Sequence, residues 1–252
     1  MTRELDPTTY DVLDHVARYR IGVAEALIAT PPFADVSPAR MKRMLRALCE
    51  APSPSPTPAT AGPLLASAPL FGSRRYVYLT RAGRAAIGEA ETEVEAGQGR
   101  RRRAGAFSEI AKVRAYGVLA FCCLSGRPRQ RLTVEEFRRT FPEHHRPGLP
   151  MGYYADHQAR RLGFVRVDAG GRGRWDRIAE KVREDVRRHR ELPAFRASIA
   201  AGAFELALVT ATRRKAERLW PIFDEEGRAS GVPIHVHVVP ELLELIAPPP
   251  RR

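Results

Sequence analysis

Apolar residues in the first fifty positions recur at helical spacing in three successive stretches. "DPTTYDVLDHVARYR" opens with Asp6 as a candidate N-cap and Pro7 at the first helical position, which are residue types typical of a helix start. A short stretch, "VAEALIA", comes next, and "SPARMKRMLRALCEA" then opens with Ser37 and Pro38 in the same cap arrangement. The pattern predicts three helices, the last of which covers residues 37–50.

The third predicted helix divides into an apolar stripe and a basic face. The stripe occupies positions i, i+3, i+4 and i+7: Met41, Met44, Leu45 and Leu48. Four cations spread around the opposite face: Arg40, Lys42, Arg43 and Arg46. A helix with a core stripe on one side and cations on the other suits docking in the major groove of DNA.

The segment after this helix predicts a loop and then a two-stranded ribbon. Residues 51–63, "APSPSPTPATAGP", form a tract that holds no regular structure and predicts a disordered loop. "SRRYVYLT" alternates as a strand does and contains Arg74 and Arg75, which can reach phosphate or the minor groove. "YVYLTRAGRAAI" resembles the wing end of many bacterial winged-helix regulators. We therefore expect residues 1–98 to form a winged helix–turn–helix DNA-binding domain.

The rest of the chain predicts an α/β domain over residues 99–252. "FSEIAKVRAYGVLAFCCL" is apolar nearly all round, so it predicts a buried helix. "LTVEEFRRTFPE" contains Thr133 and Glu136 at the spacing of a capping box, and a charged helix is expected from about Trp175 to Arg190. "FELALVT", "RRKAERLWPIFDEEG" and "VPIHVHVV" then read as strand, helix and strand. The expected fold class of the whole chain is α+β.

Charge points to a polyanionic partner. The net charge is +13, and residues 100–190 hold 23 Lys and Arg against 10 Asp and Glu, whereas the segments on either side are balanced. Concentrated positive charge favours phosphate contacts because they release counterions. The run of arginines that includes Arg101 and Arg102 lies at the start of this basic part. The sequence shows no membrane-spanning run and no basic, apolar-anchored membrane helix, so we expect double-stranded DNA and no membrane as the partner.

The cysteines and the N-terminus indicate the compartment. Cys49, Cys122 and Cys123 are an odd number without metal-ligand or disulfide spacing, so we expect reduced thiols. "MTRELDPTTYDVLDHV" lacks the basic start and apolar core of a signal peptide. Both features favour a cytoplasmic protein.

Residues 163–182, "GFVRVDAGGRGRWDRIAEKV", pair a strand-end carboxylate with a lysine on the following helix. Together with "DVLDHVARYRIGVAEAL", "YADHQARRLGFVRVD" and "LALVTATRRKAERLW", this stretch resembles the replication-relaxation family of bacterial plasmids and mobile elements. Members of that family join an N-terminal winged helix to a domain similar to PD-(D/E)xK nucleases. The resemblance follows the order and spacing of these stretches over most of the chain, although each motif is short.

The resemblance implies a nuclease-type site with one departure. It places the first carboxylate at Asp156, preceded here by Ala155 instead of proline, the later acidic residue at Asp168 and the helix lysine at Lys181. The position where the family has glutamate holds Arg166. Such chemistry needs carboxylates that converge on a divalent cation such as Mg²⁺, which a guanidinium cannot bind. The departure favours a nuclease-like domain that binds DNA without cutting it, with no cofactor; Mg²⁺ is expected only if the endonuclease alternative holds.

A second alternative remains open for the middle of the chain. Residues 112–124, 133–141 and 153–162 also suit the three helices of a second winged helix, with residues 163–178 as its wing. Arg172 and Arg174 would then be phosphate contacts at the wing tip. In this alternative Asp168 is only a wing residue.

These observations favour a bacterial DNA-binding regulator of transcription or of plasmid or mobile-element replication. Such regulators usually bind paired half-sites, so we expect a homodimer. The competing hypotheses are a metal-dependent endonuclease and a module that binds an acidic protein. The expected DNA contacts are Arg40, Lys42, Arg43, Arg46, Arg74, Arg75, Arg101, Arg102, Arg172 and Arg174.

Overall fold

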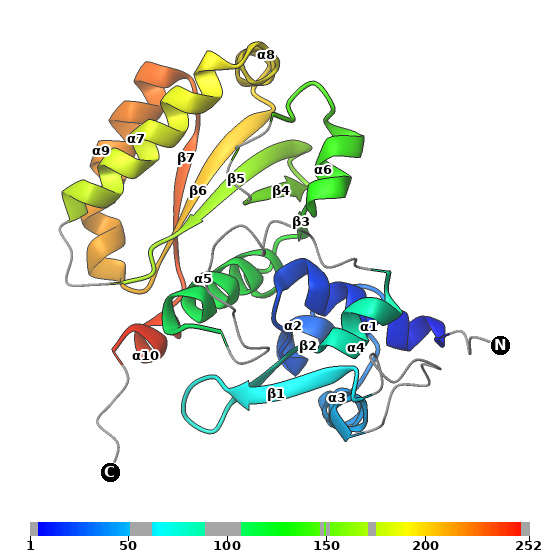
Figure 1. Cartoon of the computed structure of the whole chain (residues 1–252). Coiled ribbons are helices and arrows are strands. Elements are labelled where there is room, and N and C mark those ends of the chain that lie inside the picture. The colour runs from blue at the N-terminus through cyan, green and yellow to red at the C-terminus, as the bar shows by residue number, and fades with distance from the viewer. Residues whose placement is uncertain are drawn as a thin grey trace, which may run out of the picture. The chain divides into compact units, whose positions relative to one another are not determined.

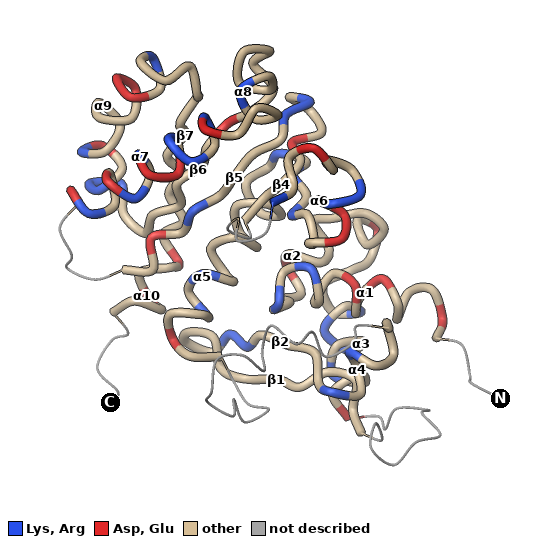
Figure 2. The backbone as a smooth tube through the Cα atoms, turned by 45° about the horizontal axis from the view of Figure 1, so that its top comes forward, with Lys and Arg blue, Asp and Glu red and all other residues tan. Residues whose placement is uncertain are grey.

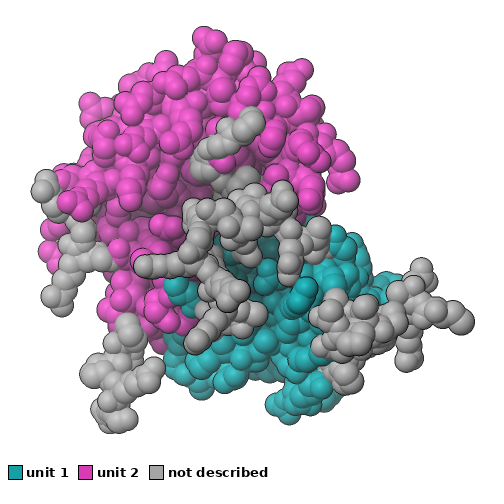
Figure 3. Space-filling view, viewed as in Figure 1, with its two compact units in different colours: residues 1–108 teal, residues 109–252 magenta. Residues whose placement is uncertain are grey.

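The chain is a mixed α+β protein, as expected from the sequence, and it divides into two units (Figures 1 and 3). The computed structural model describes residues 5–50, 62–88, 107–146, 149, 152–170 and 175–247. Unit 1 is residues 1–108 and unit 2 is residues 109–252. The boundary expected between residues 98 and 99 and most of the predicted loop 51–63 lie outside the described residues.

Unit 1 has the predicted order of three helices followed by an antiparallel ribbon. Leu65 pairs with Leu79 at one end of the ribbon and Pro69 pairs with Arg75 at the other. A short helix then follows the ribbon. The elements are α1 (Pro7–Tyr19), α2 (Ala24–Ile28), α3 (Pro38–Glu50), β1 (Leu65–Pro69), β2 (Arg75–Leu79) and α4 (Arg81–Ala86).

Local hydrogen bonds fix these elements where the sequence predicted them. Asp6 caps α1 by accepting a hydrogen bond from the backbone N–H of Thr9 at 2.9 Å. Gly22 exchanges two backbone hydrogen bonds with Val77, at 2.8 and 2.9 Å, which ties the α1–α2 connection to β2. The helices and the ribbon share one core: Val12, Leu13, Val16, Ala24, Leu27, Phe33, Met41, Leu45, Leu64, Leu65, Val77 and Leu79.

Unit 2 is built on a five-stranded mixed sheet with the order β3-β4-β5-β6-β7 in its described part. The pairs β3–β4 and β4–β5 are antiparallel, and β5–β6 and β6–β7 are parallel. The strands are β3 (Arg129–Arg131), β4 (Tyr153–Asp156), β5 (Arg161–Val167), β6 (Phe204–Thr210) and β7 (Ile234–Val238). The helices are α5 (Glu109–Leu119) with the π-helical turn η3 (Ala120–Leu124), α6 (Val134–Thr140), α7 (Trp175–Glu191), α8 (Pro193–Ala200), α9 (Arg213–Ser230) and α10 (Leu242–Ile246).

Helices cover both faces of this sheet. In Figure 1, α7 and α9 lie over one face, and α5 lies on the other. Phe164 on β5 and Leu206 on β6 point into the core under α7, α8 and α9, which also contains Val182 and Phe195. On the opposite face, a Cβ added at Gly117 would lie 2.6 Å from Val167 Cγ1, so only glycine allows α5 to approach β5 this closely.

The alternative of a second winged helix in the middle of the chain is wrong. Its third helix would cover residues 153–162, where the structure has β4 and the start of β5, and its wing would include the start of α7. Consecutive side chains point to opposite faces of a strand, and the two tyrosines of β4 use both faces. Tyr153 stacks on Phe137 in one core, whereas Tyr154 donates a hydrogen bond to Glu205 on the other side of the sheet.

Other sequence expectations concern the cysteines and membrane segments. Cys122 and Cys123 are buried in η3, Cys49 is half-buried, and none of the three is in a disulfide. Within the ranges that the structure describes, no helix combines the length and the apolar character needed to cross a membrane.

Candidate nucleic-acid interface

The basic face of α3 is exposed, and its apolar stripe is packed. Met41 and Leu45 are buried in the core of unit 1, and Met44 and Leu48 pack at its margin. Within the described part of the chain, the side chains of the four cations on the other face show no hydrogen bond or ion pair, and all four are exposed: Arg40, Lys42, Arg43 and Arg46. The helix therefore presents unpaired cations to solvent.

The β1–β2 ribbon carries the other two arginines predicted in unit 1. Arg75 donates hydrogen bonds to Ser67, from Nε to Oγ at 2.9 Å and from a terminal nitrogen to the carbonyl oxygen at 3.2 Å. Arg74 lies in the turn between the strands, and its guanidinium carbon is 5.3 Å from the centre of the Phe71 ring. Both arginines are exposed, but Arg75 uses part of its donor set within the ribbon.

Four predicted contacts lie outside the described residues: Arg101, Arg102, Arg172 and Arg174. By sequence, the first two precede unit 2 and the other two belong to the connection between β5 and α7.

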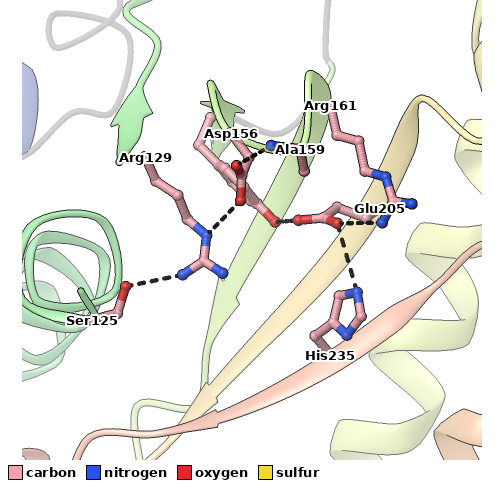
Figure 4. A network of polar contacts seen from close by, with 8 residues as sticks. Ser125, Arg129, Asp156, Ala159, Arg161, Glu205 and His235 are labelled. Carbon is pink, nitrogen blue, oxygen red and sulfur yellow. Dashed lines mark hydrogen bonds and ion pairs between the residues drawn. The ribbon is translucent and has the colours of Figure 1, made fainter. Parts of the chain in front are cut away.

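Asp156, the first carboxylate implied by the resemblance, belongs to a buried polar network (Figure 4). Arg129 donates from Nε to Asp156 Oδ2 at 3.2 Å, and the guanidinium also reaches Ser125 Oγ at 3.0 Å. The other carboxylate oxygen of Asp156 accepts the backbone N–H of Ala159 at 2.8 Å, in the turn that leads to β5. Asp156 is therefore occupied in holding β3, β4 and the β4–β5 turn together.

Glu205 is a second buried carboxylate in this network, and the sequence reasoning missed it. It accepts hydrogen bonds from Tyr154 at 2.6 Å and Arg161 at 3.3 Å, and His235 Nε2 lies 3.6 Å away. Burial alone would raise the pKa of Glu205, but the nearby His235 and the hydrogen bonds from Tyr154 and Arg161 outweigh it and lower the pKa to about 2. The only sequence signal was one acidic residue inside the apolar strand "FELALVT".

Arg166, at the position where the family has glutamate, forms an ion pair with a carboxylate of helix α7. Its Nε and a terminal nitrogen donate to the two oxygens of Asp185 on α7, at 2.6 and 2.8 Å. This bidentate pair links β5 to α7. Arg188 also lies 3.6 Å from Asp185.

The residues implied for the nuclease alternative do not converge on one site. Asp156 pairs in register with Arg161 at the start of β5, whereas Asp168 follows the end of β5. Seven residues of strand place the two carboxylates roughly 20 Å apart. Asp168 forms an ion pair with Lys215 of α9, and Lys181 is exposed on α7. Carboxylates so separated, each facing a cation, do not fit a shared Mg²⁺ ion.

The described part of unit 2 thus uses the implied carboxylates as structural ion pairs, and the described part of unit 1 leaves the cations of α3 free. No group of three or more His, Cys, Asp or Glu suited to a metal ion occurs among the described residues. No protein-family model, no curated protein and no solved structure matches this chain.

Proposed function

We propose that this protein is a sequence-specific double-stranded DNA-binding regulator, of transcription or of plasmid or mobile-element replication. Unit 1 would act as a winged helix–turn–helix domain, with α3 as its recognition helix. The observation that carries the proposal is the basic face of α3, where four exposed cations have no protein partner among the described residues. The core stripe of Met41 and Leu45 fixes this face toward solvent.

The geometry of unit 1 supports docking in the major groove. A single helix fits that groove, and an arginine there can donate two hydrogen bonds to guanine O6 and N7. Arg43 and Arg46 are one helical turn apart, so they face neighbouring base pairs or phosphates. Arg74, in the turn of the β1–β2 ribbon, is available for the adjacent phosphates.

For unit 2 we propose a nuclease-like fold that binds DNA without cutting it. The order of β5, α7 with Lys181, β6 and the arginine-bearing α9 is the order that the replication-relaxation resemblance implies. The separation of Asp156 from Asp168 supports a non-catalytic role. The positive surplus of residues 100–190 supplies sequence-independent affinity, and we expect a homodimer on paired half-sites.

A footprint of the protein on the DNA upstream of its own gene, together with selection from random duplexes, tests the proposal. We expect a defined protected site and salt-sensitive binding. Arg43→Ala should weaken binding to the selected site by about 1–3 kcal/mol and relax the preference at one base pair. Arg138→Ala on α6, which removes the same charge from another exposed position, serves as the control.

Two results would contradict the proposal. Tight binding without any base preference would remove sequence-specific regulation. Loss of DNA binding confined to changes in residues 100–190, with Arg43→Ala without effect, would instead favour a module whose basic part binds an acidic protein.

A further inference from the structure

Three helices of unit 2 enclose an arginine-lined groove that has no role in the site described above. One hollow of about 470 Å³ is lined by Arg183, Val186, Arg187, Arg190, Glu191, Arg196 and Glu226. A neighbouring hollow of about 500 Å³ shares Arg190 and Arg196 with it and extends along α8 to Ser230 and Gly231. Figure 2 shows Lys and Arg positions in blue along α7 and α8.

The spacing along α7 places three arginines in one row. Arg183, Arg187 and Arg190 stand at i, i+4 and i+7, so they share one face of the helix. Arg196 on α8 lines the same hollow. The row extends over about 10 Å of helix, since each residue rises by about 1.5 Å.

Most of this charge is not neutralised within the protein. Arg183 pairs with Glu226 at 3.4 Å and with Glu180 at 3.7 Å. In the described ranges, the side chains of Arg187, Arg190 and Arg196 show no ion pair or hydrogen bond, and all three are exposed. Glu191 is the other acidic residue of the lining, so the groove keeps an excess of unpaired guanidinium groups.

The shape of this lining selects an extended anion. The three α7 arginines follow one another along about 10 Å of helix, so a row of phosphates can contact all of them, whereas a single phosphate spans only part of that length. One DNA strand carries a phosphate at every nucleotide, so a row of arginines can contact consecutive phosphates. Among the described residues, the lining has no aromatic ring on which a base could stack.

We propose that this groove binds the sugar–phosphate backbone of a nucleic acid strand, independently of base sequence. The inference rests on the proposed function, because DNA is the ligand in both, but it assigns the non-specific affinity to a separate unit. Base readout then belongs to α3, and phosphate binding by unit 2 belongs to Arg187, Arg190 and Arg196.

The test compares Arg187→Ala/Arg190→Ala with Arg138→Ala/Arg177→Ala in the full chain, using labelled duplex of random sequence over a series of salt concentrations. The control pair removes the same charge from exposed positions of α6 and α7 that do not line the groove. Each phosphate contact contributes about 0.9 to the slope of log affinity against log salt. We expect the groove variant to lower that slope by about 2 and to weaken all duplex sequences alike, while the control keeps the wild-type slope.

Equal slopes in the groove variant, the control and the wild-type protein would overturn the proposal that the groove binds the backbone. The proposed function would still stand if Arg43→Ala weakens binding to the specific site. If the wild-type protein binds no duplex, the proposed function fails and labelled single-stranded DNA becomes the probe. If Arg187→Ala/Arg190→Ala then fails to bind single-stranded DNA and the control variant still binds it, the groove proposal is supported. Equal binding of single-stranded DNA by all variants, or no binding by any of them, would overturn the proposal. Tight binding of tripolyphosphate without any binding of oligonucleotide would also overturn the backbone assignment.

Discussion

Arg129 and Asp156 form an ion pair with both side chains almost completely buried, 2% and 1% exposed. The guanidinium carbon of Arg129 lies 4.2 Å from the centre of the Phe121 ring, so the pair also links the sheet to η3. Asp156 is the residue to which the family resemblance assigns the first catalytic carboxylate. Its environment gives it a structural role instead.

The first prediction concerns the stability of this pair. Asp156→Ala leaves the Arg129 charge buried without its partner, and breaking such a pair costs about 3–5 kcal/mol. We expect a loss of that size in the free energy of unfolding, measured by urea denaturation. The double variant Arg129→Met/Asp156→Leu should be closer to wild type, because it removes both buried charges. Unchanged unfolding of Asp156→Ala would contradict the structural role.

Local interactions are the part of this fold that the sequence predicted well. The Asp6 cap and the Thr133–Glu136 capping box are both present, because each joins residues three positions apart. The exposed cations of α3 also followed from helical periodicity alone. Strand β4 was harder to predict, because the residues of "YYADHQARRL" also suit a helix. The strand is stabilised by contacts of its two tyrosines on opposite faces of the sheet, which the local sequence does not show.

Contacts between distant segments decided the rest of the candidate site. Arg166 and Asp185 are 19 positions apart, and Asp168 and Lys215 are 47 apart. No spacing rule connects residues so far apart, so the sequence showed Arg166 and Asp168 but not Asp185 and Lys215, which pair with them. The same holds for the arginine groove, in which Arg196 joins the α7 row only after the chain turns into α8.

The second prediction is a pH dependence centred on His189. This side chain is fully buried; its Nε2 is 2.9 Å from the Tyr153 hydroxyl, and its Nδ1 is 2.6 Å from the Asp185 carbonyl oxygen. Burial disfavours the charged ring and lowers the pKa of His189 to about 4, from an ordinary value of 6.5. As the pH falls, the unfolded chain therefore takes up this proton before the folded protein does. The contribution of neutral His189 to stability is fully present above pH 6.5 and is lost as the pH falls toward 4.

His189→Gln should be less stable than wild type at pH 7 but should lose less stability between pH 7 and pH 4. The measurement is the free energy of unfolding at a series of pH values. His15 of unit 1 and His237 of unit 2 have similarly lowered pKa values, so some dependence remains in the variant. Parallel curves for the variant and the wild-type protein would show that His189 takes no part.

The third prediction separates the core of α3 from its basic face. Met41 is completely buried, and truncation of such a side chain costs about 2–5 kcal/mol. Met41→Ala should therefore lower the unfolding temperature of unit 1 and weaken DNA binding through loss of the fold. Arg43→Ala should weaken DNA binding without changing that temperature, because its side chain is exposed and unpaired in the described structure. Thermal unfolding followed by circular dichroism, with binding measured below the transition, distinguishes the two. A drop in unfolding temperature for Arg43→Ala would show that the basic face is part of the fold.

The fourth prediction concerns Arg166, where the family has glutamate. If the arginine had merely disabled a nuclease, Arg166→Glu should restore cleavage of plasmid DNA in Mg²⁺ or Mn²⁺. We expect no cleavage, because the new carboxylate would lie beside Asp185 and roughly 16 Å from Asp156 by strand rise. The change should also destabilise unit 2, since Asp185 is 2% exposed, loses its bidentate partner and gains a like charge, with Arg188 as its remaining cation. Arg166→Met, which removes the pair without adding a carboxylate, should be less destabilised than Arg166→Glu. Metal-dependent cleavage by Arg166→Glu, abolished by Asp156→Ala or Asp168→Ala, would overturn the non-catalytic assignment of this unit.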